Sequence, residues 1–220
     1  MRWRENPAMS HDKHVTGSLT ILLACLLVAC HRDPPAAAGA PPAAPTPQDE
    51  FWRALSGLCG NAYRGTIGAN EGGGSAPDPF EDQELVMHVR TCTDDEIRVP
   101  FHVGGDRSRT WVFTRTSQGL RLKHDHRHED GSLDALTMYG GDNAAGGSAS
   151  EQRFPADEYS REMFTREGRA QSVTNTWIVT LHPGQRYSYA LVRPGRQFRV
   201  DFDLENAVAT PPAPWGAADE

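Results

Sequence analysis

The stretch IRVPFHV at residues 97–103 places an apolar side chain at every second position. Successive side chains of an extended strand point to opposite faces, so this stretch has one apolar face and one more polar face. The stretches LVMHV at 85–89 and FRVDFDL at 198–204 repeat this period of two. A buried helix face would need a period near 3.6, so the chain is predicted to be mainly β, with strands buried on one side.

Short turn signals separate these strands, for example Gly104-Gly105, Pro183-Gly184 and Pro194-Gly195. Short connections join antiparallel neighbours, and closing the sheet removes its exposed edges. We therefore expect an antiparallel up-and-down β-barrel. Further strands are expected at 62–67, 108–116, 119–128, 133–139, 173–182 and 185–193.

Two short helices are expected beside the strands, one at 49–58 and one that begins after an Asp157 N-cap and stops at Gly168. The first of them can plug one end of a barrel. This order of a helix, a Gly-rich first strand and an up-and-down barrel resembles the calycin or lipocalin layout, and the domain is similar to other secreted bacterial proteins. The resemblance implies a small apolar ligand inside the barrel, although the lipocalin Gly-x-Trp signature is absent.

The N-terminal region contains an apolar run, LTILLACLLVA at 19–29. It is too short for a transmembrane helix, which needs about 20 residues, so residues 1–29 are predicted to be a signal peptide. The sequence Leu27-Val28-Ala29-Cys30 resembles the lipobox of bacterial lipoproteins. That resemblance implies cleavage before Cys30 and acylation of its sulfur. The alternative is an ordinary secretory peptide that leaves Cys30 as a thiol.

Residues 30–49 are expected to be a lipidated cysteine followed by a tether, because 31–49 contain six prolines and six alanines. An extended tether of this length reaches up to about 60 Å. In lipoproteins an Asp after the cysteine favours retention in the inner membrane, and here that position is His31. We therefore expect an outer-membrane location, with a barrel domain at 50–208 in the periplasm or at the cell surface. Residues 209–220 are expected to form a disordered tail.

The chain is acidic, with 22 Lys and Arg against 29 Asp and Glu and a formal net charge of −7. A negative surface disfavours nucleic acid and anionic lipid headgroups. The expected membrane contact is therefore made by acyl chains on Cys30 and not by a basic patch. We expect a monomer with no nucleic-acid partner.

Cys59 and Cys92 are the two cysteines left once Cys25 is removed with the signal and Cys30 takes the lipid. An even pair in an oxidising compartment predicts a disulfide. The alternative is a pair of buried thiols. The spacing is not Cys-x-x-Cys, which argues against a redox-active or zinc-binding pair.

The run KHDHRHED at 123–130 holds three histidines at alternate positions. On a strand, His124, His126 and His128 would share the more apolar face and line the barrel interior near one mouth. Neighbouring histidines lie about 6.6 Å apart, which suits zinc, whereas the outer two lie about 13 Å apart and cannot share one ion. A zinc site would use a pair of them with Glu129 or Asp130 from the turn. The alternative is that they are solvated at the rim or hydrogen-bonded to Tyr139 and Thr137.

The stretch RTWVFTR at 109–115 interleaves arginines with aromatic residues. Arg109, Trp111 and Arg115 share one face of the expected strand. If a ligand enters the barrel, an anionic amphiphile with its head at Arg109 or Arg115 suits this wall, together with Tyr139 across the sheet. The alternative is that the aromatic residues only pack the core.

Together these patterns predict a lipid-anchored binding or structural module and not an enzyme. No His-Glu-x-x-His or Gly-x-Ser-x-Gly motif is present, and the histidine run matches the metallo-β-lactamase and cupin motifs incompletely. The rival hypotheses are a metal-dependent enzyme at the histidine row and a lipoprotein that contacts other envelope components. An internal cavity of several hundred Å³ favours ligand binding, and a filled barrel favours a scaffold.

Overall fold

The computed structural model describes residues 44–73, 78–143 and 147–217. The expected signal peptide at 1–29, the expected lipidation site Cys30 and most of the expected tether lie outside the described residues. No helix within the three described ranges is long and apolar enough to cross a membrane.

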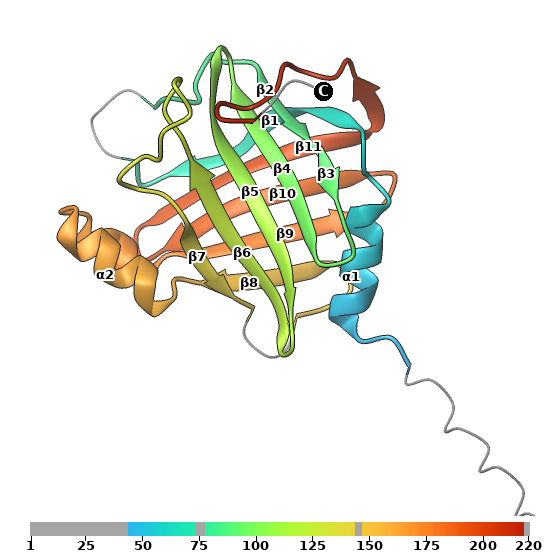
Figure 1. Ribbon diagram of the computed structural model, residues 1–220, viewed down its shortest axis with the longest axis horizontal. Coiled ribbons are helices and arrows are strands. Elements are labelled where there is room, and N and C mark those ends of the chain that lie inside the picture. The colour runs from blue at the N-terminus through green and yellow to red at the C-terminus, as the bar shows by residue number, and fades with distance from the viewer. Residues whose placement is uncertain (1–43, 74–77, 144–146, 218–220) are drawn as a thin grey trace, which may run out of the picture. The chain divides into compact units, whose positions relative to one another are not determined.

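The described chain folds into one antiparallel sheet that curls into a nearly closed barrel (Figure 1). The strand order is β7-β6-β5-β4-β2-β1-β11-β10-β9-β8, and the short β3 pairs with β4. Apart from β3 and the β7/β8 step, strands that follow one another in the chain pair with each other, and β1 pairs with β11, which confirms the predicted up-and-down barrel. The strands are β1 (Ala62–Glu71), β2 (Leu85–His88), β3 (Thr91–Cys92), β4 (Glu96–Val103), β5 (Asp106–Thr116), β6 (Gly119–His126), β7 (Tyr139–Asp142), β8 (Glu151–Pro155), β9 (Thr176–His182), β10 (Arg186–Arg193) and β11 (Arg196–Val208).

The barrel interior is packed with large apolar side chains that the period of two directs inward. Ile97 and Val99 of β4 and Val200 and Phe202 of β11 are fully buried, as the alternation predicts. Burying one such side chain stabilises the fold by about 1.5–3 kcal/mol. The largest fully buried side chains are Trp111, Trp177, Tyr187, Phe51, Phe113, Phe154 and Phe202.

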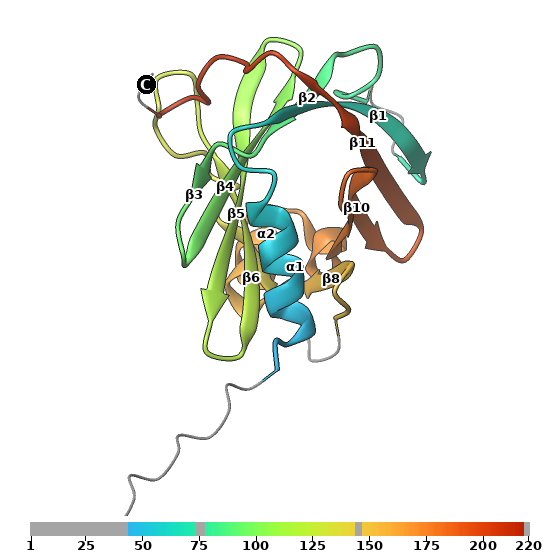
Figure 2. The same cartoon turned by 90° about the vertical axis from the view of Figure 1, so that its right-hand side faces the viewer.

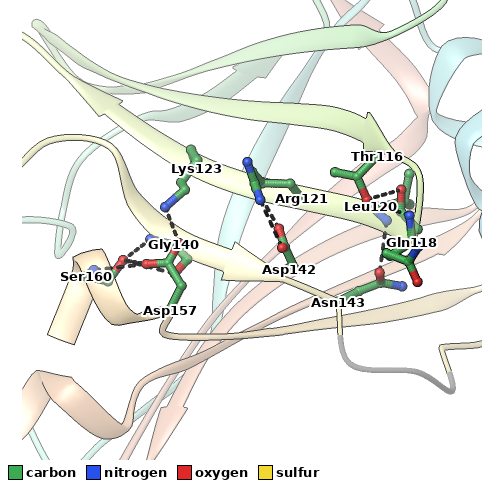
Figure 3. A network of polar contacts seen from close by, with 11 residues as sticks. Thr116, Gln118, Leu120, Arg121, Lys123, Gly140, Asp142, Asn143, Asp157 and Ser160 are labelled. Carbon is green, nitrogen blue, oxygen red and sulfur yellow. Dashed lines mark hydrogen bonds and ion pairs between the residues drawn. The ribbon is translucent and has the colours of Figure 1, made fainter.

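Strands β7 and β8 do not pair with each other, and polar contacts join this seam instead (Figure 3). The Asp157 backbone N–H donates to the Gly140 carbonyl at 2.8 Å. The Ser160 hydroxyl accepts from the Gly140 N–H at 2.8 Å and donates to the Gly140 carbonyl at 3.0 Å. Lys123 of β6 forms an ion pair with the Asp157 carboxylate. The barrel is thus closed here by the start of a helix and not by a strand ladder.

Helix α1 (Pro47–Ser56) begins inside the stretch expected to be the tether, which corrects that boundary. Thr46 and Asp49 form a capping box: the Thr46 hydroxyl accepts from the Asp49 N–H at 3.1 Å, and the Asp49 carboxylate accepts from the Thr46 N–H at 3.0 Å. Pro47 suits the first turn, where its missing N–H costs nothing. The helix lies across one end of the barrel (Figure 2), and its buried residues are Phe51, Trp52 and Leu55.

Helix α2 (Glu158–Arg166) lies at the other end of the molecule from α1 (Figure 1). Its N-cap is Asp157, as predicted, and the Asp157 carboxylate accepts from the Ser160 N–H at 2.9 Å. A short 3-10 helix, η1 (Ala170–Thr174), connects it to β9. The two predicted helices are therefore confirmed.

Residues 209–217 were expected to be a disordered tail, but they lie along the outer face of the barrel. The Trp215 N–H donates to the Arg107 carbonyl at 3.1 Å, and the Arg107 guanidinium donates to the Ala213 carbonyl at 2.9 Å. Three prolines keep this segment extended, so few of its backbone groups need partners. The sequence of the segment does not indicate this ordered position, because the contacts that fix it are made with Arg107 of β5, which is distant in sequence.

Cys59 and Cys92 form the predicted disulfide, with their Cα atoms 6.3 Å apart and a separation of 33 positions in sequence. It ties the turn that follows α1 to β3. Replacing both cysteines by alanine is expected to lower the free energy of unfolding by about 3–4 kcal/mol, because the unfolded chain loses a constraint. Urea denaturation of the wild type and the double variant measures this difference. Equal midpoints and slopes for the two proteins would contradict the prediction.

Candidate ligand-binding cavity

A cavity of about 400 Å³ lies inside the barrel at the end away from α1. The connections that follow β1, β4, β6, β8 and β10 meet at this end, because antiparallel neighbours reverse direction at each step. The lining residues are Phe80, Phe101, Arg109, Trp111, His124, His126, Asp134, Leu136, Tyr139, Phe164, Arg169, Ser172, Asn175, Trp177, Tyr189, Leu191, Arg193, Arg196 and Phe198.

The strand period of two positions one wall of this cavity. Arg109 and Trp111 of β5 point inward, and so do His124 and His126 of β6. Trp111 pairs across the sheet with His124, and Arg109 pairs with His126. The four side chains therefore form one continuous patch, in which Arg109 lies nearer the start of β5 than Trp111 does. The expectation that these two histidines face the interior is confirmed.

Aromatic rings make up most of the cavity wall, with eight aromatic residues and only two leucines in its lining. Trp111 stacks on Tyr189 with ring centroids 4.3 Å apart and on Phe101 at 4.9 Å. The ring centroids of Tyr139 and Trp177 lie 5.4 Å apart in the cavity wall. Such rings offer broad apolar faces together with polar hydroxyl and indole groups.

The histidines of the cavity are neutral at pH 7. Burial, reinforced by the neighbouring His126, lowers the pKa of His124 to about 3. Burial, reinforced by the positive charge of Arg109, lowers the pKa of His126 to about 4. Burial also raises the pKa of Tyr139 and Tyr189 above the usual tyrosine value, so both hydroxyls stay protonated. These four side chains contribute no charge to the cavity.

Hydrogen bonds link the same side chains to one another. His124 Nδ1 donates to the Tyr139 carbonyl at 3.0 Å, because a carbonyl can only accept. His124 Nε2 is then the acceptor of the neutral ring, and the Tyr189 hydroxyl donates to it at 2.7 Å. His126 Nε2 and the Tyr139 hydroxyl share a hydrogen bond of 3.1 Å. The Nε2 atom of each histidine thus forms a hydrogen bond with a tyrosine hydroxyl inside the cavity.

Four arginines line the cavity, against one carboxylate, Asp134. Two of the four have acidic partners. Arg109 lies 2.5 Å from an Asp106 oxygen, and Arg196 lies 3.8 Å from an Asp78 oxygen. The other two are Arg169 and Arg193.

Arg193 donates to the Asn175 side-chain oxygen at 3.2 Å. Within the described residues, neither Arg193 nor Arg169 has a carboxylate within ion-pair distance. Burial and the neighbouring charge of Arg196 lower the pKa of Arg193. The cavity therefore has an excess of positive charge, although the whole chain is acidic.

Comparison with protein-family models, curated proteins and solved structures gives no match. Function is therefore inferred from the shape and chemistry of the cavity. Its aromatic wall and excess of arginine are the two features that bear on it.

Three of the four residues expected to bind a ligand line this cavity: Arg109, Trp111 and Tyr139. Arg115 does not, because it lies six residues along β5 from Arg109, about 20 Å away. It forms an ion pair with Asp49 of α1 and lies over the Trp52 ring, 5.4 Å from its centroid. A broader depression of about 760 Å³ at that end is lined mostly by polar residues. Arg115 is therefore not part of the same site.

The structure does not bring the proposed zinc ligands together. Strand β6 ends at His126, so His128 leaves the alternation, and its side chain is 57 % exposed at a turn. Glu129 is exposed as well. Within the described ranges no group of three or more His, Cys, Asp or Glu side chains could hold a metal ion. His124 and His126 instead form hydrogen bonds with Tyr139, which is the alternative to a zinc site that the sequence left open.

The strand expected at 133–139 is a loop, with β7 beginning only at Tyr139. One isolated bridge joins Arg127 to Leu133. Asp134 then accepts from the Leu136 backbone N–H at 2.7 Å, which bends the chain away from a strand. This local side-chain bond competes with the ladder and brings Asp134 and Leu136 to the cavity.

Sequence reasoning missed Arg169, Arg193 and Arg196. Arg193 and Arg196 flank the predicted turn at 194–195, and counting strands places that turn at the same barrel end as the turn at 104–105. Counting the strands could therefore have identified Arg193 and Arg196 from the sequence. Arg169 reaches the cavity from the long connection between β8 and β9, where no periodicity predicts its position.

Proposed function

We propose that this chain is a lipid-anchored lipoprotein of the bacterial outer membrane whose barrel binds a small anionic amphiphile. The main support for a binding role is the cavity inside the barrel. Its volume of about 400 Å³ lies within the range of small-molecule sites, about 300–1,000 Å³. A barrel that served only as a scaffold would have no need of a lined cavity of this size.

The charge of the cavity supports an anionic ligand. Arg169 and Arg193 lack carboxylate partners among the described side chains, and the histidines beside them are neutral. Arg193 is half-buried without a counter-charge, and an anion held there at the mouth of the cavity is screened less by water than on an open surface. The aromatic walls favour an apolar body. A molecule with both parts is an anionic amphiphile.

The membrane anchor is proposed from Leu27-Val28-Ala29-Cys30, with His31 favouring the outer membrane. Replacing Cys30 by serine is expected to remove the protein from the membrane fraction, because the acyl chains supply the attachment. Replacing Cys25 by serine is the matched control, since Cys25 lies in the signal peptide and should leave anchoring intact. Carbonate-washed membranes and mass spectrometry of the mature N-terminus measure both. An unmodified Cys30 sulfur would refute the anchor.

The binding role is tested with two carboxylates and their alcohols: 2-naphthoate with 2-naphthalenemethanol, and undecanoate with undecanol. The lipidated protein is held in lipid nanodiscs, and empty nanodiscs provide the blank in equilibrium dialysis. At least one carboxylate is expected to bind about 10-fold or more tightly than its alcohol, because charge-assisted hydrogen bonds to arginine are lost in the alcohol. The proposal fails if neither acid binds above the blank, or if both alcohols bind as tightly as the acids.

A further inference from the structure

We propose that the ligand is a planar aromatic acid of two or three fused rings, with its carboxylate held by Arg193 and Arg169. This inference rests on the proposed function, which leaves the body of the amphiphile open. It names the chemical class of that body and the residues that hold its acid group.

The wall composition favours an aromatic body over an alkyl chain. Eight aromatic side chains but only Leu136 and Leu191 among aliphatic ones line the cavity. Aromatic rings gain from offset or edge contacts with one another beyond the area they bury. A flat ligand ring can make such contacts with several neighbours at once, and an alkyl chain cannot.

The size of the cavity sets the number of rings. An apolar cavity of about 150 Å³ accepts one benzene ring. The present cavity, at about 400 Å³, is between two and three times as large. A rigid fused-ring body also loses less conformational freedom on binding than a flexible chain of the same carbon number.

The acid group has a defined place among the arginines. Asp106 and Asp78 already engage Arg109 and Arg196, respectively. The Arg193 guanidinium donates a hydrogen bond to the Asn175 amide oxygen, and within the described residues neither Arg193 nor Arg169 forms an ion pair. The planar fork of a guanidinium matches the two oxygens of a carboxylate. These two arginines are therefore the available anion-binding groups.

The deeper part of the cavity does not compete for the acid group. His124 and Tyr189 are hydrogen-bonded to each other, and His126 is bonded to Tyr139. At pH 7 neither histidine carries a positive charge to attract the carboxylate. The ring system is thus directed inward against Trp111, and the carboxylate is directed toward the arginines.

The decisive comparison is between 2-naphthoate and undecanoate, which have the same number of carbon atoms and the same acid group. In the nanodisc dialysis, naphthoate is expected to bind about 10-fold or more tightly than undecanoate. Arg193→Gln is expected to weaken naphthoate binding about 10-fold or more. Arg186→Gln is the matched control, because Arg186 is exposed at the opposite end of β10 and should leave binding unchanged.

Arg169→Gln provides a second variant on an exposed residue, in case Arg193→Gln does not fold. It is expected to weaken naphthoate binding severalfold with an unchanged circular dichroism spectrum. If undecanoate binds as tightly as naphthoate or more tightly, the aromatic inference is overturned and the proposed function stands. If neither acid binds, both are overturned. If naphthoate binds but Arg169→Gln and Arg186→Gln affect it equally, the assigned acid-binding groups are wrong.

Discussion

Replacing Gly141 by alanine is expected to lower the free energy of unfolding by about 4 kcal/mol or more. Gly141 lies in β7, beside the seam where β7 and β8 do not pair. A Cβ at this position would lie 1.9 Å from the Pro155 carbonyl oxygen. A backbone oxygen cannot turn away as a flexible side chain does, so the two sides of the seam must move apart.

Separation of the seam removes several hydrogen bonds at once. The Asp157 N–H, the Gly140 carbonyl and the buried Ser160 hydroxyl all depend on the present spacing. Each buried polar group left without a partner costs about 1–3 kcal/mol. The loss is therefore larger than for an ordinary overpacked core residue, which costs about 1–3 kcal/mol.

Gly105→Ala is the matched control for this prediction. Gly105 lies in the turn between β4 and β5, and a Cβ there would meet nothing within 4 Å. The same change of residue should therefore leave stability within about 0.5 kcal/mol. Urea unfolding of both variants, followed by circular dichroism, gives the comparison. Equal stability of the Gly141 and Gly105 variants would show that the seam can widen without loss.

The barrel could be predicted from the sequence because burial on one side leaves a period of two, as in Ile97, Val99 and Phe101. The seam could not. The seam depends on hydrogen bonds from Asp157 and Ser160 to Gly140. The sequence signal for the start of a helix is the same whether or not that helix joins two strands of a barrel. Periodicity identifies strands and faces but says nothing of which two strands fail to pair.

The candidate site was predicted in part for the same reason. His124 and His126 fall on the inner face because β6 keeps its alternation as far as His126. Beyond that residue the chain turns, and the extrapolation to His128 fails. Arg115 shares a face with Arg109, but sharing a face does not mean sharing an end of the barrel. Whether a side chain reaches the cavity depends on its position along the strand as much as on the face it occupies, because each residue advances the chain by about 3.3 Å.

Lowering the pH from 7.5 to 5 is expected to reduce the free energy of unfolding by about 6 kcal/mol, through two buried histidines and the half-buried His126. The pKa of His124 lies at about 3, and those of His126 and His102 lie at about 4. Burial is the main cause for each, and at His102 the positive charge of Arg107 adds to it. In the unfolded chain all three titrate near 6.5.

The sign follows from which state binds protons. Between pH 6.5 and about 4 the unfolded chain protonates His102, His124 and His126, whereas the folded chain does not. Acid therefore favours unfolding across this window, by about 2 kcal/mol for each histidine at pH 5. Asp49, whose pKa is lowered by hydrogen bonds from Thr46 and Arg115, loses its stabilising charge only below this window. The loss between pH 6.5 and 5 can therefore be assigned to the histidines.

Replacing His102 by glutamine separates this effect from a general acid response. The imidazole Nε2 of His102 is buried without a hydrogen-bond partner in the described structure, so no specific bond is lost at that atom. The variant should lose stability with falling pH less steeply, by about 1.4 kcal/mol per pH unit. His128→Gln is the matched control, because the His128 side chain is 57 % exposed. Urea midpoints measured from pH 7.5 to 4.5 would contradict the prediction if the wild type and His102→Gln gave parallel curves.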